Sequence, residues 1–167
     1  MNIPTHVLTS YWAAKRLGAR HPWALAFGAF IPDTYYACKA SVVMVRERRL
    51  PGPNDLDYFR PRTKTADVLG HSLLPAGATM LWGWVARQPR LTAFAQGWIG
   101  HILVDLAMHH TDAAPPFAPV SARVFHSPVS GSERDRYAVL VVTGEVALCI
   151  LCVWNLARNR GSHVRAR

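Results

Sequence analysis

The C-terminal part of the sequence contains one continuous apolar segment, YAVLVVTGEVALCILCVW, at residues 137–154. An α-helix needs about 20 mostly apolar residues to cross the hydrocarbon core of a bilayer. The segment carries a single acid, Glu145, and it is followed by Arg158 and Arg160, a basic flank typical of membrane-spanning helices. The alternative is a helix buried in a protein core. Because of its length and basic end, the segment predicts a transmembrane helix near the C-terminus.

The composition agrees with a membrane-associated protein of one domain. Half of the 167 residues are hydrophobic and only 17% are charged, compared with about 25% in soluble globular domains. The six tryptophans point the same way, because indole rings favour the bilayer interface. A chain of this length is ordinary for one domain. We therefore expect a single helical domain over residues 1–157, with an exposed loop at about 46–65 and a basic disordered tail at 158–167.

Capping and turn signals divide the remaining sequence into further helices. Thr5 can cap a first helix that stops at Gly18, and Pro22 opens a second apolar segment that Pro32 closes. The expected helices lie at about 5–17, 22–32, 66–86, 90–110 and 137–154, and helical character can also continue from 34 to 45. The sequence thus predicts an all-α bundle of about five helices, of which the third, fourth and last lie in or against a bilayer.

The net charge of +9 could indicate a nucleic-acid partner, but the arginines are dispersed in loops rather than aligned along one helix. We therefore expect no nucleic-acid partner. A basic loop can instead attract the anionic head groups of membrane lipids, unless its arginines are only solvated charge. These loop residues are Arg46, Arg48, Arg49, Arg60 and Arg62.

The strongest indication of chemistry is the spacing His101-x-x-x-Asp105-x-x-x-His109. Intervals of four residues place all three side chains on one face of a helix. Imidazole and carboxylate groups are usual ligands of zinc and related divalent ions. The alternative is an amphipathic helix whose polar face holds two histidines, but ionisable residues in an apolar segment are costly to bury and usually functional. The neighbouring His110 would either replace His109 or assist it.

Three further candidate ligands, His6, Asp33 and His71, stand near the ends of other expected helices. A lone histidine is more often a surface or capping residue. If successive helices alternate in direction, however, these side chains and the His101–His110 end of the fourth helix lie on one side of the bundle. The expected metal ligands are therefore His6, Asp33, His71, His101, Asp105 and His109, and His110 and His126 could assist catalysis.

The turns on the opposite side of such a bundle carry only basic charges. By the positive-inside rule these turns are cytoplasmic, so the expected metal site faces the extracytoplasmic side. The basic residues are Lys15, Arg16, Arg20, Arg87, Arg90, Arg158 and Arg160.

Four segments resemble a bacterial family of membrane-bound, metal-dependent hydrolases that is sometimes described as binding the repressor LexA. They are NIPTHVLTSYWAAKRLG, GAFIPD, HSLLPAG and GWIGHILVD. That family is similar to zinc-dependent phospholipases C and P1-type nucleases, so the resemblance implies an integral protein of the bacterial cytoplasmic (inner) membrane that binds zinc. It implies that the ligands are His6, Asp33, His71, His101 and Asp105, together with His109 or His110.

The resemblance has one clear departure. The soluble enzymes also use a His-x-x-x-Glu pair, whereas here His126 is followed at that spacing by Ser130. The number of metal ions is therefore left open.

Together these observations predict a hydrolase that cleaves a phosphoester, such as one in a lipid. The attacking water would be activated by a divalent metal, with zinc as the first candidate. Two alternatives remain. One is a noncatalytic integral-membrane module that binds a partner protein. The other is a small transporter component in which Glu145, Asp105 and the histidines form a proton or ion path. For Glu145 itself, a structural partner between helices is the simpler interpretation.

Overall fold

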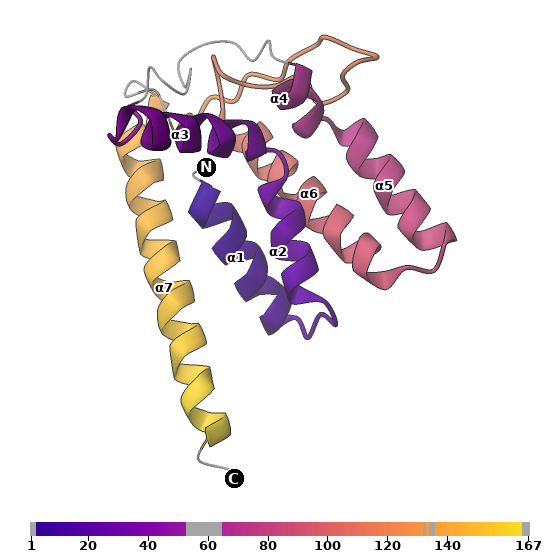
Figure 1. Ribbon diagram of the computed structural model, residues 1–167, viewed down its shortest axis with the longest axis vertical. Coiled ribbons are helices and arrows are strands. Elements are labelled where there is room, and N and C mark those ends of the chain that lie inside the picture. The colour runs from indigo at the N-terminus through magenta and orange to yellow at the C-terminus, as the bar shows by residue number, and fades with distance from the viewer. Residues whose placement is uncertain (1–2, 53–64, 132, 134–135, 165–167) are drawn as a thin grey trace.

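The computed structural model describes residues 3–52, 65–131, 133 and 136–164. In these residues the chain forms seven α-helices and no strand, so the all-α prediction is confirmed (Figure 1). The helices are α1 (Ile3–Arg16), α2 (Pro22–Phe30), α3 (Thr34–Glu47), α4 (Thr65–Gly70), α5 (Leu73–Val85), α6 (Pro89–Met108) and α7 (Ala138–Val164).

The number of helices exceeds the expected five for two local reasons. Residues 34–47 form a separate helix, α3, after a turn at Asp33. The helix expected over 66–86 is interrupted between α4 and α5, because Ser72 adopts an extended conformation and its Oγ accepts a hydrogen bond from the Leu74 backbone N–H at 3.2 Å. This is the geometry of an N-cap, which starts a new helix.

Several helix and loop boundaries in the structure also differ from the expected ones. Thr5 was expected to cap the first helix, but α1 already begins at Ile3 and Thr5 is buried inside it. α7 continues to Val164, through part of the segment expected to be a disordered tail, and residues 165–167 lie outside the described residues. Within the expected loop at 46–65, α3 continues to Glu47, and Arg60 and Arg62 also lie outside the described residues.

The centre of the fold is a close crossing of α2 and α6. A Cβ added to Gly28 would lie 1.7 Å from the carbonyl oxygen of Phe94, and one added to Gly97 would lie 1.8 Å from that of Leu25. Only glycine permits two helix backbones to approach so closely. α5 packs on α6, α1 packs on α2, and α7 packs on α1. The crossing therefore holds α6 in register with α2, one turn before His101.

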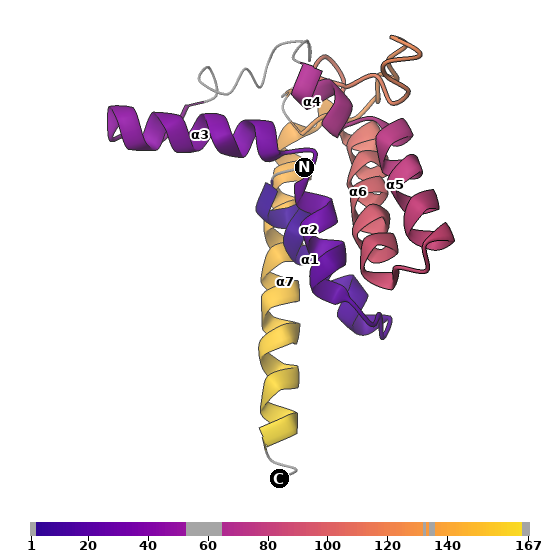
Figure 2. The ribbon, with the colours of Figure 1, turned by 45° about the vertical axis from the view of Figure 1, so that its right-hand side comes forward.

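The bundle has two different ends. α7 runs along the long axis, and α1, α2, α5 and α6 lie obliquely to one side of it (Figures 1 and 2). α3 lies across one end of the molecule, with α4 next to its N-terminal part. The start of α1, the end of α2 and the end of α6 all lie toward this end. Segments far apart in the sequence therefore meet beneath α3 and α4.

Two helices are long and apolar enough to cross a membrane, Pro89–Met108 and Ala138–Arg158, and the apolar helix Leu73–Val85 is shorter. Length and composition alone are weak evidence, because the core helix of a soluble protein passes the same test. Only 11% of the apolar window in Ala138–Arg158 is buried, however. α7 is therefore not a core helix of the described chain.

Candidate metal centre

All six residues that the sequence predicted as metal ligands lie together at the α3 end of the bundle. His6 comes from the first turn of α1, Asp33 from the turn between α2 and α3, and His71 from the break between α4 and α5. His101 and Asp105 come from the last two turns of α6, and His109 directly follows that helix. Five of the six residues are buried, and the His109 side chain is 12% exposed.

The carboxylate of Asp105 is the centre of this cluster. Its Oδ1 atom lies 3.0 Å from Nε2 of His6 and 3.3 Å from Nε2 of His109. Its Oδ2 atom lies 3.3 Å from Nε2 of both His71 and His101. Four imidazoles therefore present the same ring nitrogen to one carboxylate, with two of them facing each oxygen.

The other ring nitrogen of three of these histidines is held by an acceptor outside the cluster. Nδ1 of His101 lies 2.6 Å from the carbonyl oxygen of Ala29, and Nδ1 of His71 lies 2.9 Å from that of Asp67. Nδ1 of His109 lies 2.8 Å from Oδ2 of Asp112. Because these acceptors require a proton on Nδ1, a neutral ring has a lone pair on Nε2. This is the arrangement of metal-binding histidines, whose second nitrogen donates to a carbonyl or a carboxylate.

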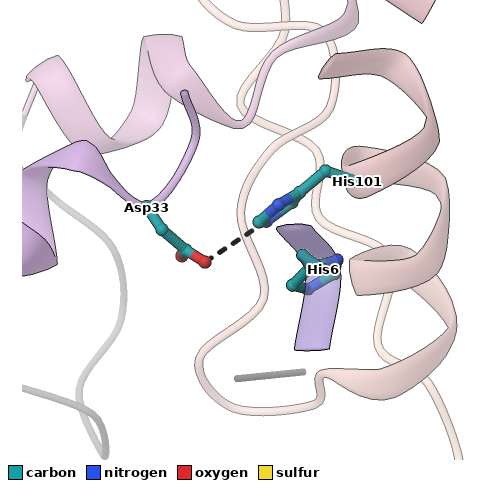
Figure 3. Close-up of side chains that lie close together, drawn as sticks. All are labelled: His6, Asp33 and His101. Carbon is teal, nitrogen blue, oxygen red and sulfur yellow. Dashed lines mark ion pairs between the residues drawn. The ribbon is translucent and has the colours of Figure 1, made fainter. Parts of the chain in front are cut away.

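Asp33 completes the cluster. It occupies the N-cap position of α3, yet its side chain makes no capping hydrogen bond. Instead Oδ2 faces Nε2 of His101 at 3.9 Å (Figure 3). Its Oδ1 lies 3.9 Å from Nε2 of His71. Within the residues that the structure describes, neither the buried Oδ2 of Asp33 nor the buried Nε2 of His101 has a hydrogen-bond partner. A buried acceptor pair is costly to leave unpaired, and a cation between the two atoms would relieve that cost.

The distances within the cluster suit a small divalent ion. Zinc binds imidazole nitrogen and carboxylate oxygen at about 2.0–2.2 Å, so neighbouring ligand atoms in a tetrahedral site lie about 3.3 Å apart. Two groups have ligand atoms that all lie within 4.8 Å of one another: His6, Asp33 and His101, and also His71, His101 and Asp105. The donor set and its spacing therefore fit zinc.

Burial and neighbouring carboxylates together set the pKa values of two histidines in the cluster, His6 and His109. Burial lowers the pKa of His6 from 6.5 to about 4, although its hydrogen bond to Asp105 acts in the opposite direction. The imidazole of His6 is therefore neutral at pH 7, as a metal ligand must be. It stacks on His101 with ring centroids 3.6 Å apart. Burial alone would lower the pKa of His109, but the carboxylates of Asp105 and Asp112 outweigh burial and raise it.

A small pocket opens beside the cluster. It is lined by His71, Ile102, Asp105, Leu106, His109, Ala113 and Ala114, and its volume of about 10 Å³ is close to the smallest space that holds one water molecule. The pocket therefore has room for water next to the candidate ligands.

The two residues proposed to assist catalysis lie in a separate pair. Nδ1 of His110 is 2.7 Å from the carbonyl oxygen of Ser127, and Nδ1 of His126 is 2.7 Å from that of His110. Their ring centroids are 5.3 Å apart. His109, rather than His110, therefore faces Asp105.

Glu145 also lies outside this cluster. It is buried on the face of α7 that also carries Cys149, whose Sγ donates to Oγ1 of Thr5 at 3.4 Å. Asn155, further along α7, accepts a hydrogen bond from the Trp12 indole at 3.3 Å. This face of α7 thus contacts α1.

Sequence reasoning missed two buried acids that support the histidines. Asp67 accepts a hydrogen bond from the Tyr36 hydroxyl at 3.0 Å, and its Oδ1 lies 3.1 Å from Nδ1 of His71. Asp112 holds His109. Both stand at helical spacings from their histidines, four residues before His71 and three after His109. The same spacing rule that selected His101 and Asp105 could have found Asp67.

Comparison with known proteins leaves the family open. No protein-family model, curated protein or solved structure matches this chain.

Proposed function

We propose that this protein is a membrane-embedded, metal-dependent hydrolase that cleaves a phosphoester, with zinc as the first candidate metal. The single observation that carries the proposal is the convergence of four Nε2 atoms on Asp105, with Asp33 facing His101 across a gap that no hydrogen bond fills within the described residues. The proposed ligands are His6, Asp33, His71, His101, Asp105 and His109.

The chain itself prepares the ligands for this role. Ala29, Asp67 and Asp112 fix the imidazole rings, so the nitrogens that face the centre need no rearrangement before they bind an ion. The buried helix crossing excludes bulk water from one side, and the pocket beside His71 and His109 admits water from the other. A divalent ion bound there supplies Lewis acidity and lowers the pKa of a coordinated water toward neutrality.

A membrane location is supported by where the exposed apolar and aromatic residues lie. α7 exposes a long apolar surface that includes Val139, Ile150 and Val153. Trp23 and Trp84 are more than half exposed at the ends of α2 and α5 away from α3, and Trp154 is 57% exposed in the C-terminal half of α7. Exposed arginines occur near these same ends, at positions 16, 87, 90 and 158. Aromatic and basic residues together are typical of a membrane–water interface.

A phosphoester substrate is proposed from the chemistry of the site and from the resemblance to bacterial membrane-bound hydrolases. The charge that develops on phosphoryl oxygens is stabilised by divalent ions. The proposed membrane is the bacterial cytoplasmic membrane, with the α3 end on the extracytoplasmic side, because the charged residues at the opposite helix ends are all basic, whereas the α3 end carries acids as well as arginines.

The test is elemental analysis of the purified protein in detergent, compared with a His101→Ala/Asp105→Ala variant. His21 lies outside the cluster, at the start of α2, so His21→Ala is the matched control. We expect stoichiometric zinc in the wild type and the control and loss of zinc in the double variant. The zinc-loaded protein should hydrolyse a diester such as bis(p-nitrophenyl) phosphate, and the double variant should not. Absence of metal from all three proteins would refute the proposal.

One observation favours a second function, a noncatalytic membrane module stabilised by metal. The pocket of about 10 Å³ accommodates a water but not a phosphoester. Stoichiometric metal together with no turnover of water-soluble or lipid phosphoesters would favour this module.

A further inference from the structure

The outer half of α3 extends away from the bundle and has no role in the metal centre. In both views α3 lies across the direction of α7, and Figure 2 shows its C-terminal end extending beyond the other helices. Val42, Val45 and Leu50 are 50%, 78% and 81% exposed. We propose that this segment, residues 38–50, whose helical part ends at Glu47, lies on the anionic head groups of a lipid bilayer.

The apolar residues of α3 form a stripe on one face. Cys38, Val42 and Val45 stand at positions i, i+4 and i+7, which share one side of a helix. Tyr36, by contrast, is buried, and its hydroxyl reaches Asp67 of α4. At about 100° per residue the stripe lies 120–180° around the helix from Tyr36. The stripe therefore faces away from α4 and is available to another surface.

Basic residues border this stripe. Residues 34–52 contain four basic side chains, Lys39, Arg46, Arg48 and Arg49, and one acid, Glu47. Glu47 pairs with Arg49 at 2.6 Å. Arg46 and Arg48 are exposed, and Lys39 lies one residue after Cys38, with its Nζ above the ring of Tyr35. An apolar stripe flanked by basic residues is the pattern of helices that lie in the bilayer interface and are attracted to anionic lipids.

The position of α3 relative to α7 indicates that a bilayer surface covers the apolar stripe of α3. The start of α7 lies at the level of α3 in both views. The apolar part of α7, Ala138–Arg158, has 21 residues, and at 1.5 Å per residue it spans about 30 Å, the thickness of a hydrocarbon core. If α7 crosses the bilayer, α3 must lie in the plane of the head groups. This step rests on the membrane location in the proposed function.

The N-terminal end of α3 is linked to the candidate metal centre. Asp33 is the N-cap residue of α3, and its carboxylate stands farther from the histidines, at 3.9 Å, than that of Asp105 does. Tyr36 is joined through Asp67 to His71. Contact of α3 with the head groups therefore sets the positions of two candidate ligands, and it brings the centre to the level where lipid phosphoesters lie.

The test measures the depth of α3 in liposomes of phosphatidylglycerol and phosphatidylcholine. A nitroxide is attached at Val45→Cys in a full-length chain that carries Cys38→Ala, Cys149→Ser and Cys152→Ala. The matched control is a nitroxide at Glu47→Cys, about 160° around the same helix. We expect oxygen to relax the label at position 45 more than a water-soluble nickel chelate does, and the opposite order at position 47.

The contribution of charge is tested by Arg46→Gln/Arg48→Gln in the same labelled chain. Immersion of position 45 should increase with the phosphatidylglycerol fraction in the parent chain and lose this dependence in the double variant. Equal exposure of positions 45 and 47 to the nickel chelate at every lipid composition would overturn the inference.

Zinc content, measured on the same samples, separates the two proposals. An immersed α3 without zinc would refute the metal centre and support the surface helix. Bound zinc with α3 in water would do the reverse.

Discussion

The Nε2 atom of His101 and the Oδ2 atom of Asp33 face each other at 3.9 Å, both are buried, and neither has a hydrogen-bond partner in the part of the chain that the structure describes. Two buried acceptor atoms in this position repel each other. A cation between them would remove both costs, since the desolvated carboxylate and the imidazole lone pair would each gain a bond. The pair therefore provides the most direct test of the metal centre.

Replacement of Asp33 by asparagine should weaken zinc binding by more than about tenfold, because the change removes a ligand charge while keeping the shape of the side chain. Glu47→Gln, an exposed carboxylate on the same helix, is the matched control and should leave affinity unchanged. Competition with a chromogenic chelator measures both. Equal affinity of Asp33→Asn and wild type would exclude Asp33 as a ligand.

Asp112 should affect zinc affinity through His109, although its carboxylate does not face the centre of the cluster. Asp112→Ala removes the acceptor that lies 2.8 Å from Nδ1 of His109, so the ring loses its fixed tautomer and orientation. Changes of this kind typically cost about 10–100-fold in metal affinity or activity. Glu133→Gln is the control, because Glu133 accepts from the Thr111 backbone N–H in the same region at 3.1 Å. If both variants bind zinc equally well, Asp112 has no orienting role.

The metal-free protein should lose stability on acidification because of His6. Burial lowers the pKa of His6 from 6.5 in the unfolded chain to about 4 in the folded one. Between these values the unfolded chain binds a proton that the folded chain does not, so the free energy of unfolding falls as the pH decreases from 6.5 to 4. The loss amounts to about 3 kcal/mol for this group.

This dependence can be measured by thermal unfolding in detergent with a chelator present. His6→Gln should show a flatter profile than the wild type between pH 6.5 and 4, because glutamine does not titrate. Parallel profiles for the two proteins would show that His6 is not buried in its neutral form.

The α2–α6 crossing should tolerate no side chain at Gly97. In Gly97→Ala the added Cβ would lie 1.8 Å from the carbonyl oxygen of Leu25, so the helices must separate, at a cost of about 2 kcal/mol. Because His101 is one turn further along α6, zinc affinity should fall as well.

Gly77→Ala on α5 is the matched control for this change. In the described structure its Cβ would meet nothing within 4 Å, and alanine favours a helix by about 1 kcal/mol over glycine. We expect Gly77→Ala to raise the unfolding temperature and Gly97→Ala to lower it. A stable Gly97→Ala variant that keeps its zinc would contradict the close crossing.

Much of the fold followed from local patterns. The apolar run at 137–154 specified a long helix, and the spacing of His101 and Asp105 placed both on one helical face, as the structure confirms. The grouping of His6, Asp33 and His71 with them followed from helices that alternate in direction. Such inferences succeed because helical periodicity and the bounds of apolar segments depend on residues near in sequence.

Tertiary packing decided the rest. The Oγ of Ser72 also donates to the carbonyl oxygens of Pro116 and Ala118, 44 and 46 residues later. These distant contacts hold Ser72 in the break between α4 and α5, which were expected to form one helix. That His109 rather than His110 faces Asp105 depended on where α6 ends and on the acceptors that Asp112 and Ser127 provide. The carbonyl oxygen of Ala29 holds His101 only because Gly28 and Gly97 let two backbones meet. Contacts between residues distant in sequence have no local signal, so only the folded chain specifies which nitrogen of each histidine faces Asp105.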